Sequence, residues 1–201
     1  DLPLRLMGGE VLYRDIHYLY PPFSPYFNSL LYRIFGAHLD TLAFSGILFT
    51  ALLVFLCYQI ARKLMPPTEA SLAASLITVM SFKPAGSLVL SYSFAGLHAA
   101  VFALAAVLFL TRYAERRQRR DLIMSGVFIG LAAITKQEFG LAAAVTATAY
   151  AIYLHRSNLA AVFRDVSLAA VAALLVAVPV FGLFFVTIDW RILVNDCHLF
   201  Y

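Results

Sequence analysis

Residues 41–61, TLAFSGILFTALLVFLCYQIA, form a run without charged side chains that ends at Arg62 and Lys63. A membrane-spanning helix needs about 20 predominantly apolar residues. Lysine and arginine commonly follow such a helix on its cytoplasmic side. The run therefore predicts a transmembrane helix, and it sets the class of protein to which the rest of the chain must conform.

The composition of the whole chain agrees with a membrane protein. Of its 201 residues, 62% are hydrophobic and 13% are charged, and the mean hydropathy is +0.83. These values lie far outside the usual composition of soluble domains. The net charge of +4 does not indicate a nucleic-acid partner, because the positions of the charges matter more here than their sum. The two cysteines, Cys57 and Cys197, indicate neither a disulfide framework nor a thiolate metal site.

Further apolar runs follow the first one. They are residues 69–82, 94–113, 122–135, 139–154 and 166–188. We predict an all-α, polytopic transmembrane helical bundle of about six spans in a single domain, with the spans between residues 41 and 188. Residues 1–40 are expected to hold an extracytoplasmic loop and an interfacial amphipathic helix, and residues 189–201 the start of the next extracytoplasmic segment. The ends at Asp1 and Tyr201 are expected to be cuts through a longer protein.

Upstream of the first span lies a polar and aromatic opening segment, residues 9–28, with the sequence GEVLYRDIHYLYPPFSPYFN. The Pro21-Pro22 pair precedes a helix that we expect to begin near Ser24 and to end at Gly36. Such a helix is about 18 Å long, which is too short to cross a bilayer. We therefore expect it to lie in the membrane interface.

Charge divides the connections between the spans into two groups. The first group comprises residues 61–69, 112–121 and 155–165. This group holds nine Lys or Arg and four Asp or Glu. The rest of the chain holds six Lys or Arg and seven Asp or Glu. Basic connections stay on the cytoplasmic side of a membrane. The opening segment, residues 83–93 and the tip at 136–138 should therefore share the extracytoplasmic face.

The opening segment carries the first candidate site residues, Arg14, Asp15, His17 and Tyr20. Asp15 is a candidate catalytic base, because a carboxylate in a partly dry pocket can take a proton from an attacking hydroxyl. Arg14 is a candidate ligand of a phosphate or diphosphate, His17 could donate to the same anion, and Tyr20 is a further substrate-binding candidate. The alternative is an interfacial belt of tyrosines with a solvated Arg14–Asp15 pair.

Lys136 and Glu138 lie at the tip of a predicted helical hairpin whose arms are only about 21–24 Å long. Short arms place the tip where ionisable groups are costly unless they face a partner or a wet cavity. Lys136 is then a candidate ligand of a phosphate leaving group, and Glu138 would orient that group or an acceptor. The alternative is a snorkelling Lys136 with a solvated Glu138. Gly126 and Gly130 on the first arm permit the close helix packing that the hairpin needs.

Tyr92 and His98 are predicted at the same end of the span at residues 94–113. Tyr92 is a substrate-binding candidate, whereas a histidine on an apolar helix is more often a hydrogen-bonded packing residue than a ligand. The sequence contains no metal-ligand spacing, nucleotide-binding glycine loop or nucleophile elbow. We therefore expect no metal site and no cofactor, although a requirement for a divalent metal stays open.

The motif GEVLYRD at residues 9–15 is followed by the Pro-Pro pair and by an aromatic helix that ends at Phe35-Gly36. This arrangement resembles the first extracytoplasmic loop of dolichyl-phosphate-mannose protein mannosyltransferases, which are membrane glycosyltransferases of the GT-C type. The sequence AITK at residues 133–136 closes a glycine-rich span and is similar to a second recurring feature of that superfamily. The resemblance covers nearly the whole chain and rests on short motifs and helix order.

The resemblance implies an enzyme that takes a sugar from a polyprenyl-phosphate carrier and passes it, with inversion, to a hydroxyl of a lipid, glycan or protein acceptor. The reaction would occur on the extracytoplasmic face of a bacterial-type plasma membrane. In this family the catalytic acid of the first loop lies further upstream of the Gly-Glu pair than this sequence reaches, so we expect it before residue 1. The family also often has an acid in the loop where this chain has Ser91, Tyr92 and Ser93. Asp15 is then expected to position the substrate.

A flippase or transporter of lipid-linked sugars is the alternative function, and a non-catalytic assembly subunit is a third. A translocation path places polar residues at several depths of the membrane. Here the middles of the predicted spans are largely Ala, Leu, Val and Phe, and polar residues gather toward one side. This pattern favours chemistry at the membrane surface.

Overall fold

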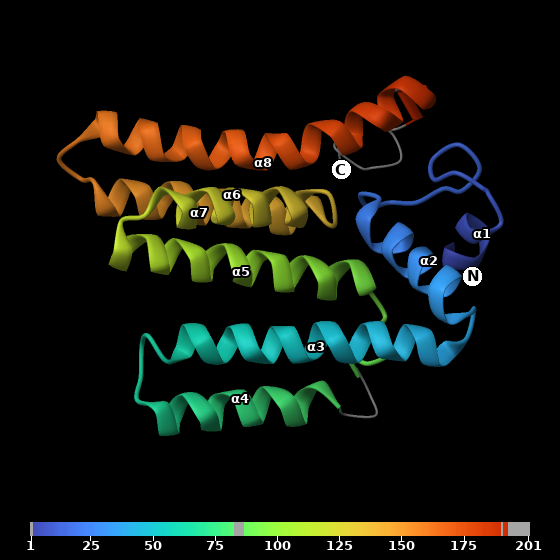
Figure 1. Ribbon diagram of the computed structural model, residues 1–201, viewed down its shortest axis with the longest axis horizontal. Coiled ribbons are helices and arrows are strands. Elements are labelled where there is room, and N and C mark those ends of the chain that lie inside the picture. The colour runs from blue at the N-terminus through green and yellow to red at the C-terminus, as the bar shows by residue number, and fades with distance from the viewer. Residues whose placement is uncertain (1, 83–86, 190, 193–201) are drawn as a thin grey trace.

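The computed structural model describes residues 2–82, 87–189 and 191–192, and these residues form helices joined by connections (Figure 1). The helices are α1 (Leu2–Met7), α2 (Phe23–Phe35), α3 (Leu39–Ala61), α4 (Pro67–Ser81), α5 (Phe94–Arg116), α6 (Arg119–Ala133), α7 (Gln137–Leu154) and α8 (Leu159–Thr187). The predicted all-α class is confirmed. Most of the segment predicted at residues 189–201 lies outside the described residues.

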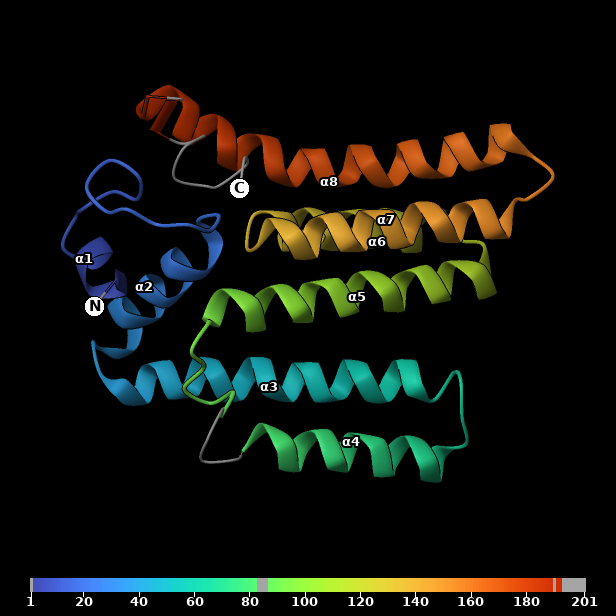
Figure 2. The same cartoon turned by 180° about the vertical axis from the view of Figure 1, so that it is seen from behind.

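The helices from α3 to α8 run side by side along one axis (Figures 1 and 2). α4 packs on α3, α3 packs on α5, α5 packs on α6 and α7, and both of these contact α8. α1, α2 and the opening segment lie across one end of this bundle. Because successive helices reverse direction, the connections alternate between the two ends.

Three helices within the described ranges are long and apolar enough to cross a membrane, namely α3, α5 and α8. They identify the chain as an integral membrane protein. α4 and α6 have 15 residues each, so they are about 22 Å long, and the 18-residue α7 is less apolar than these three. Of the six predicted spans, three therefore meet the requirement for a membrane-spanning helix and three do not.

The helix boundaries follow the predicted ones closely, except at the start of α8. This helix begins at Leu159, well before the predicted start at Val166. The reason is a cap, because the Asn158 side chain accepts a hydrogen bond from the Ala161 N–H at 3.1 Å. The predicted polar connection at 155–165 is therefore largely helical, and Asp165 lies inside α8.

α2 buries polar side chains and exposes apolar ones. Ser24, Asn28 and Ser29 are buried, whereas Ile34 and Phe35 are 61% and 59% exposed. A helix of a soluble protein would show the reverse pattern. The pattern suits a helix whose outer side faces lipid, although its predicted position in the membrane interface stays a prediction.

Gly126 and Gly130 allow the backbones of α6 and α8 to approach closely. A Cβ atom at position 126 would lie 2.3 Å from the carbonyl oxygen of Ala169, and one at position 130 would lie 2.6 Å from that of Ala173. The expectation that these two glycines serve the hairpin of α6 and α7 is therefore wrong. That hairpin uses Gly140, where a Cβ would lie 2.5 Å from the Cα of Ala133.

Candidate substrate-binding site

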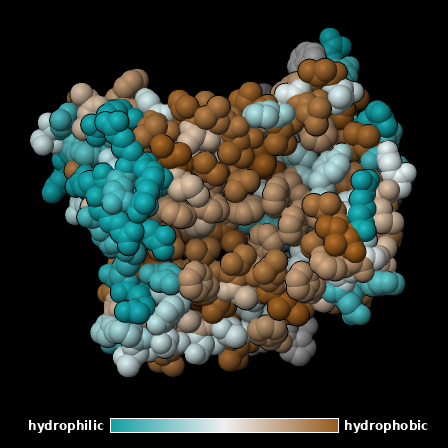
Figure 3. Space-filling view, viewed as in Figure 1, coloured by the Kyte–Doolittle hydropathy of each residue, from teal (hydrophilic) through white to brown (hydrophobic). Residues whose placement is uncertain are grey.

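The two ends of the bundle differ in charge. The basic α3–α4, α5–α6 and α7–α8 connections share one end, and the opening segment, the α6–α7 turn and the end of α8 share the other (Figures 1 and 2). In Figure 3, hydrophobic side chains cover the middle of the visible face, and hydrophilic ones gather most densely along the edge formed by the basic connections. Arg14 and Lys136, from distant parts of the sequence, thus lie at the same end of the molecule.

A groove of about 720 Å³ opens at this end between the opening segment, α2 and α8. The residues that build it include Val11, Arg14, Phe23, Phe27, Leu30, Ile134, Val180, Leu183 and Phe184. Leu30 and Leu183 are 53% and 64% exposed, so the groove is open to the surroundings of the protein. Among the described residues that line it, Arg14 is the charged one. The groove therefore suits a long apolar ligand with a negatively charged head.

The bend of α8 forms one wall of the groove. The last third of this helix turns away from the line of its first part (Figures 1 and 2), and this third begins near Pro179. Proline inside a helix removes a backbone hydrogen bond and kinks the chain. Beyond the bend, Phe184 packs against the opening segment, with its ring centroid 5.3 Å from that of Tyr13 and 6.1 Å from that of Tyr26.

The opening segment is also attached to the α6–α7 turn. The Phe23 N–H donates to the Ile134 carbonyl oxygen at 3.0 Å. The ammonium of Lys136 lies 4.9 Å from the ring centroid of Tyr20, which is within the range of a cation–π contact. Tyr20 in turn accepts a hydrogen bond through its carbonyl from the Tyr13 hydroxyl at 2.7 Å. The structure thus brings together two predicted site residues, Tyr20 and Lys136.

Arg14 and Asp15 form an ion pair at the edge of the opening segment. Arg14 Nη2 lies 2.8 Å from Asp15 Oδ2, and the same oxygen accepts the Val11 N–H at 2.8 Å. The hydrogen bond from Arg14, followed by that from Val11, lowers the pKa of the Asp15 carboxyl. An ionised carboxylate with these two donors suits a residue that holds Arg14 in place. The role of Asp15 as a general base stays a prediction.

The remaining predicted site residues lie outside this cluster. His17 and Glu138 are exposed, and Tyr92 is fully exposed in the α4–α5 connection. None of the three lines the groove as the described residues define it. Their predicted roles in substrate binding are therefore not supported by proximity and stay predictions.

His98 lies in the interior at the same end, between α2, α3 and α5. It is completely buried, with Nε2 3.4 Å from Ser45 Oγ and its ring centroid 3.9 Å from that of Phe49. Ser45 also donates to Asn28 Oδ1 at 3.0 Å, which connects α3 to α2. These contacts agree with the interpretation of His98 as a packing residue.

Sequence reasoning missed the groove walls on α2 and α8. Their phenylalanine and leucine side chains are of the same types that face lipid elsewhere in the chain, so residue type could not distinguish them. Pro179 was the available signal, because a proline inside a predicted span marks a bend.

A buried polar cluster at the basic end was missed as well. Asp165, 2% exposed, accepts hydrogen bonds from the Tyr113 hydroxyl and from Arg164, and His155 Nε2 lies 2.9 Å from its Oδ2. The cluster connects α5, the end of α7 and α8. Its signal was present in the sequence as an aspartate within an otherwise basic connection.

The described residues contain no group of three His, Cys, Asp or Glu side chains placed to hold a metal ion. The geometry defines a polytopic membrane protein with an apolar groove at one end, where Arg14 lines the groove and Lys136 contacts Tyr20. The chain matches the family model of dolichyl-phosphate-mannose-protein mannosyltransferases over residues 20–182, and it belongs to this family. Membership places it among the membrane glycosyltransferases. No curated protein and no solved structure matches the chain.

Proposed function

We propose that the chain transfers a sugar from a polyprenyl-phosphate carrier to an acceptor hydroxyl, with the groove as the binding site of the carrier lipid. The observation that carries this proposal is the apolar groove of about 720 Å³ with Arg14 at its edge. A carrier of this kind has a long hydrocarbon chain and one ionised phosphate. The groove and the guanidinium match these two parts.

The groove would mainly fix the orientation of the hydrocarbon chain and would add little to the affinity for it. Lipid tails are as apolar as the groove walls, so moving a polyprenyl chain from the bilayer into the groove gains little free energy from the hydrophobic effect. A fixed orientation nevertheless brings the phosphate and the sugar to one place, which lowers the entropy that the reaction must lose. Affinity would come mainly from contacts to the phosphate.

Arg14 and Lys136 would share the phosphate. The planar fork of Arg14 can bind two phosphate oxygens, and Asp15 holds this fork in position. Lys136, held over the Tyr20 ring, would add a point charge. When the acceptor hydroxyl attacks the anomeric carbon, its proton passes to a carboxylate general base, the bond from that carbon to the phosphate oxygen breaks, and that oxygen takes the electron pair. The two cations would stabilise this negative charge as it develops. His17, Glu138 and Tyr92 are proposed to contact the substrate during this step.

The active end is proposed to face the extracytoplasmic side of a bacterial-type plasma membrane. The support is the concentration of Lys and Arg in the connections at the other end. In this arrangement α4, α6 and α7 would complete a set of six spans, and the exposed side of α2 would lie in the interface.

The decisive experiment offers the purified full-length protein a polyprenyl-phosphate-linked sugar and an acceptor, without nucleotide sugar. We expect a new glycosidic bond and free polyprenyl phosphate, both detectable by mass spectrometry. If the protein in liposomes instead moves the intact lipid-linked sugar between leaflets and leaves its linkage unbroken, the flippase is the correct function and the proposal is wrong.

Sidedness can be measured separately by cysteine labelling. In a background without Cys57 and Cys197, a cysteine at the exposed Leu19 should react with an impermeant maleimide added outside intact cells. A cysteine at Gln118, in the basic α5–α6 connection, should react only after the membrane is opened. Labelling of both positions from the same side would contradict the arrangement of ends described above.

A further inference from the structure

We propose that the basic end of the bundle binds the phosphates of anionic phospholipids through three arginines that each lie over an aromatic ring. The guanidinium carbons of these arginines lie 5.9, 5.2 and 5.3 Å from the ring centroids. The pairs are Arg62 over Tyr58, Arg112 over Phe109 and Arg156 over Tyr153. In each pair the ring lies about one helical turn before its arginine, near the end of α3, α5 or α7.

A contact with a ring prepares a guanidinium for phosphate binding. The ring attracts the positive charge and restrains the side chain, whereas phosphate oxygens are bound by the N–H fork. An arginine held over a ring therefore loses less side-chain freedom when its fork binds a phosphate. Among the ion pairs found in the described parts of the chain, none uses Arg62, Arg112 or Arg156.

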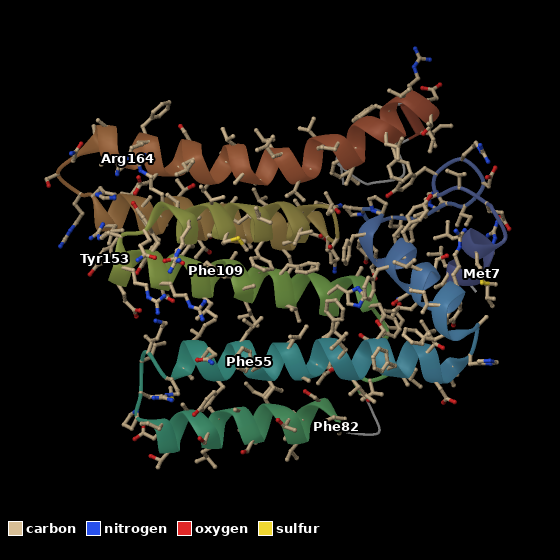
Figure 4. The ribbon with its side chains drawn as sticks, in the orientation of Figure 1. Met7, Phe55, Phe82, Phe109, Tyr153 and Arg164 are labelled. Atoms are coloured by element: carbon tan, nitrogen blue, oxygen red, sulfur yellow. The ribbon has the colours of Figure 1, made fainter. Side chains whose placement is uncertain are left out.

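The three pairs belong to one end of the molecule. An ion pair between Lys63 and Glu115 attaches the α3–α4 connection to the end of α5. In Figure 4, Tyr153 and Arg164 mark this end, and Met7 marks the opposite one. Figure 3 shows the hydrophilic side chains that gather along this edge. The end of α5, the connection after it and the start of α6 add further exposed cations, namely Arg116, Arg117, Arg119 and Arg120.

Apolar neighbours indicate a lipid as the source of the phosphate. Leu64 in the α3–α4 connection is 79% exposed, and Leu159 and Phe163 at the start of α8 are 81% and 76% exposed. Free phosphate makes no contact with exposed apolar side chains, whereas a phospholipid carries acyl chains next to its phosphate and can contact them. Tyrosine rings also occupy the headgroup level of a bilayer, where lipid phosphates lie. The site is therefore built for an amphipathic anion, and it is separate from the groove at the other end.

The test counts lipids bound to the full-length protein by native mass spectrometry. The protein is released from nanodiscs that contain equal amounts of phosphatidylglycerol and phosphatidylcholine. We expect the parent to retain phosphatidylglycerol preferentially. A cation near an anionic lipid surface contributes about fivefold to binding, so replacing Arg62, Arg112 and Arg156 by Gln should lower this preference at least about tenfold. Arg33→Gln, at the opposite end, should leave it unchanged.

A second triple variant distinguishes a site that needs arginine from a general attraction of anionic lipid to positive charge. Replacing the same three arginines by lysine keeps the charge but removes the planar fork, so we expect part of the preference to be lost. Retention of the parental preference by the lysine variant, or by the glutamine variant, would overturn the proposal. Displacement of the lipid by millimolar inorganic phosphate would show a free-phosphate site instead. If a triple variant does not fold, Arg112→Gln and Arg112→Lys decide the question, with a loss of about fivefold expected for Arg112→Gln and a smaller loss for Arg112→Lys, which keeps the charge but not the fork.

Discussion

The two parts of α8 show how one helix serves two purposes. Before Pro179, α8 packs against α6 so closely that a Cβ on Gly126 would lie 2.3 Å from the Ala169 carbonyl oxygen. Beyond Pro179 it leaves the bundle, and a Cβ on Gly182 would meet nothing within 4 Å. The first part fixes the helix and the second part forms the wall of the groove. The comparison indicates that an open groove can be built from one part of a helix while tight packing of another part holds that helix in place.

The largest effect is expected from valine at Gly126, and the same change at Gly182 is its control. Gly126→Val would force α6 and α8 apart, and we expect it to lower the free energy of unfolding by about 3 kcal/mol, at the upper end for overpacking. Gly182→Val should change it by less than about 1 kcal/mol, because the position is open and valine is no worse than glycine in a helix. Thermal unfolding of both variants in the same detergent measures the difference. Equal destabilisation would remove the distinction between the two parts of α8.

A second prediction concerns Lys136 at the groove end. A charge-assisted contact to a phosphate is worth about 1.5–3 kcal/mol, so Lys136→Ala should lower the rate of sugar transfer about ten- to a hundredfold. Lys136→Arg should recover part of the rate because the charge returns, whereas Lys136→Gln should recover little. Folding should survive in all three variants. A parental transfer rate in Lys136→Ala would mean that this lysine is a snorkelling residue.

Asp165 offers the matching test at the basic end. Asp165→Asn removes the charge that holds Arg164 and His155, and the amide cannot accept all the hydrogen bonds that the carboxylate accepts. We expect a loss of stability of about 1–3 kcal/mol, measured by thermal unfolding, with transfer activity retained in the folded fraction. Asp40→Asn, an exposed carboxylate in the first turn of α3, serves as the control and should be nearly neutral. A lower transfer rate per folded molecule would indicate that the basic end takes part in catalysis.

The smallest effect should come from Asp15, and it should depend on pH. Its pKa is lowered by Arg14 and by the Val11 N–H, so the folded state binds the proton more weakly than the unfolded state. The stabilisation is present above the ordinary carboxyl pKa of 3.8 and is lost as the pH falls through the lower folded pKa. Hydrogen exchange of the Val11 amide, corrected for its intrinsic rate, should show protection that declines only in this acid range. Asp15→Asn should weaken that protection at neutral pH. An unchanged exchange rate of the Val11 amide would exclude its hydrogen bond to Asp15.

The helical class and most helix boundaries could be predicted from the sequence because they depend on local patterns. The apolar run at residues 41–61 became α3, and Gly36, with φ 91°, ended α2 as expected. The start of α8 was missed because a single cap, Asn158, extended the helix through residues that look polar. Three of the six predicted spans are not confirmed, because α4, α6 and α7 are too short or not apolar enough to meet the requirement for a membrane-spanning helix.

The sequence could indicate candidate site residues only where they stand out by type. Arg14, Tyr20 and Lys136 were chosen because ionisable and aromatic side chains mark the ends of membrane spans; the structure places Tyr20 beside Lys136, and the roles of all three in binding stay predictions. The groove walls and the partner of Gly126 depend on which helices are neighbours in space. Helix periodicity does not contain that information, because α6 could have used its glycines against α7 as readily as against α8.

The hydrogen bond between the Phe23 N–H and the Ile134 carbonyl oxygen joins two parts of the chain through their backbones alone. Apart from proline at position 23, no side-chain replacement can delete it. Alanine scanning would therefore pass over this connection, and relatives could change both residues without losing it. The relation between the opening segment and the hairpin can thus persist through sequence divergence that erases every recognisable residue on either side.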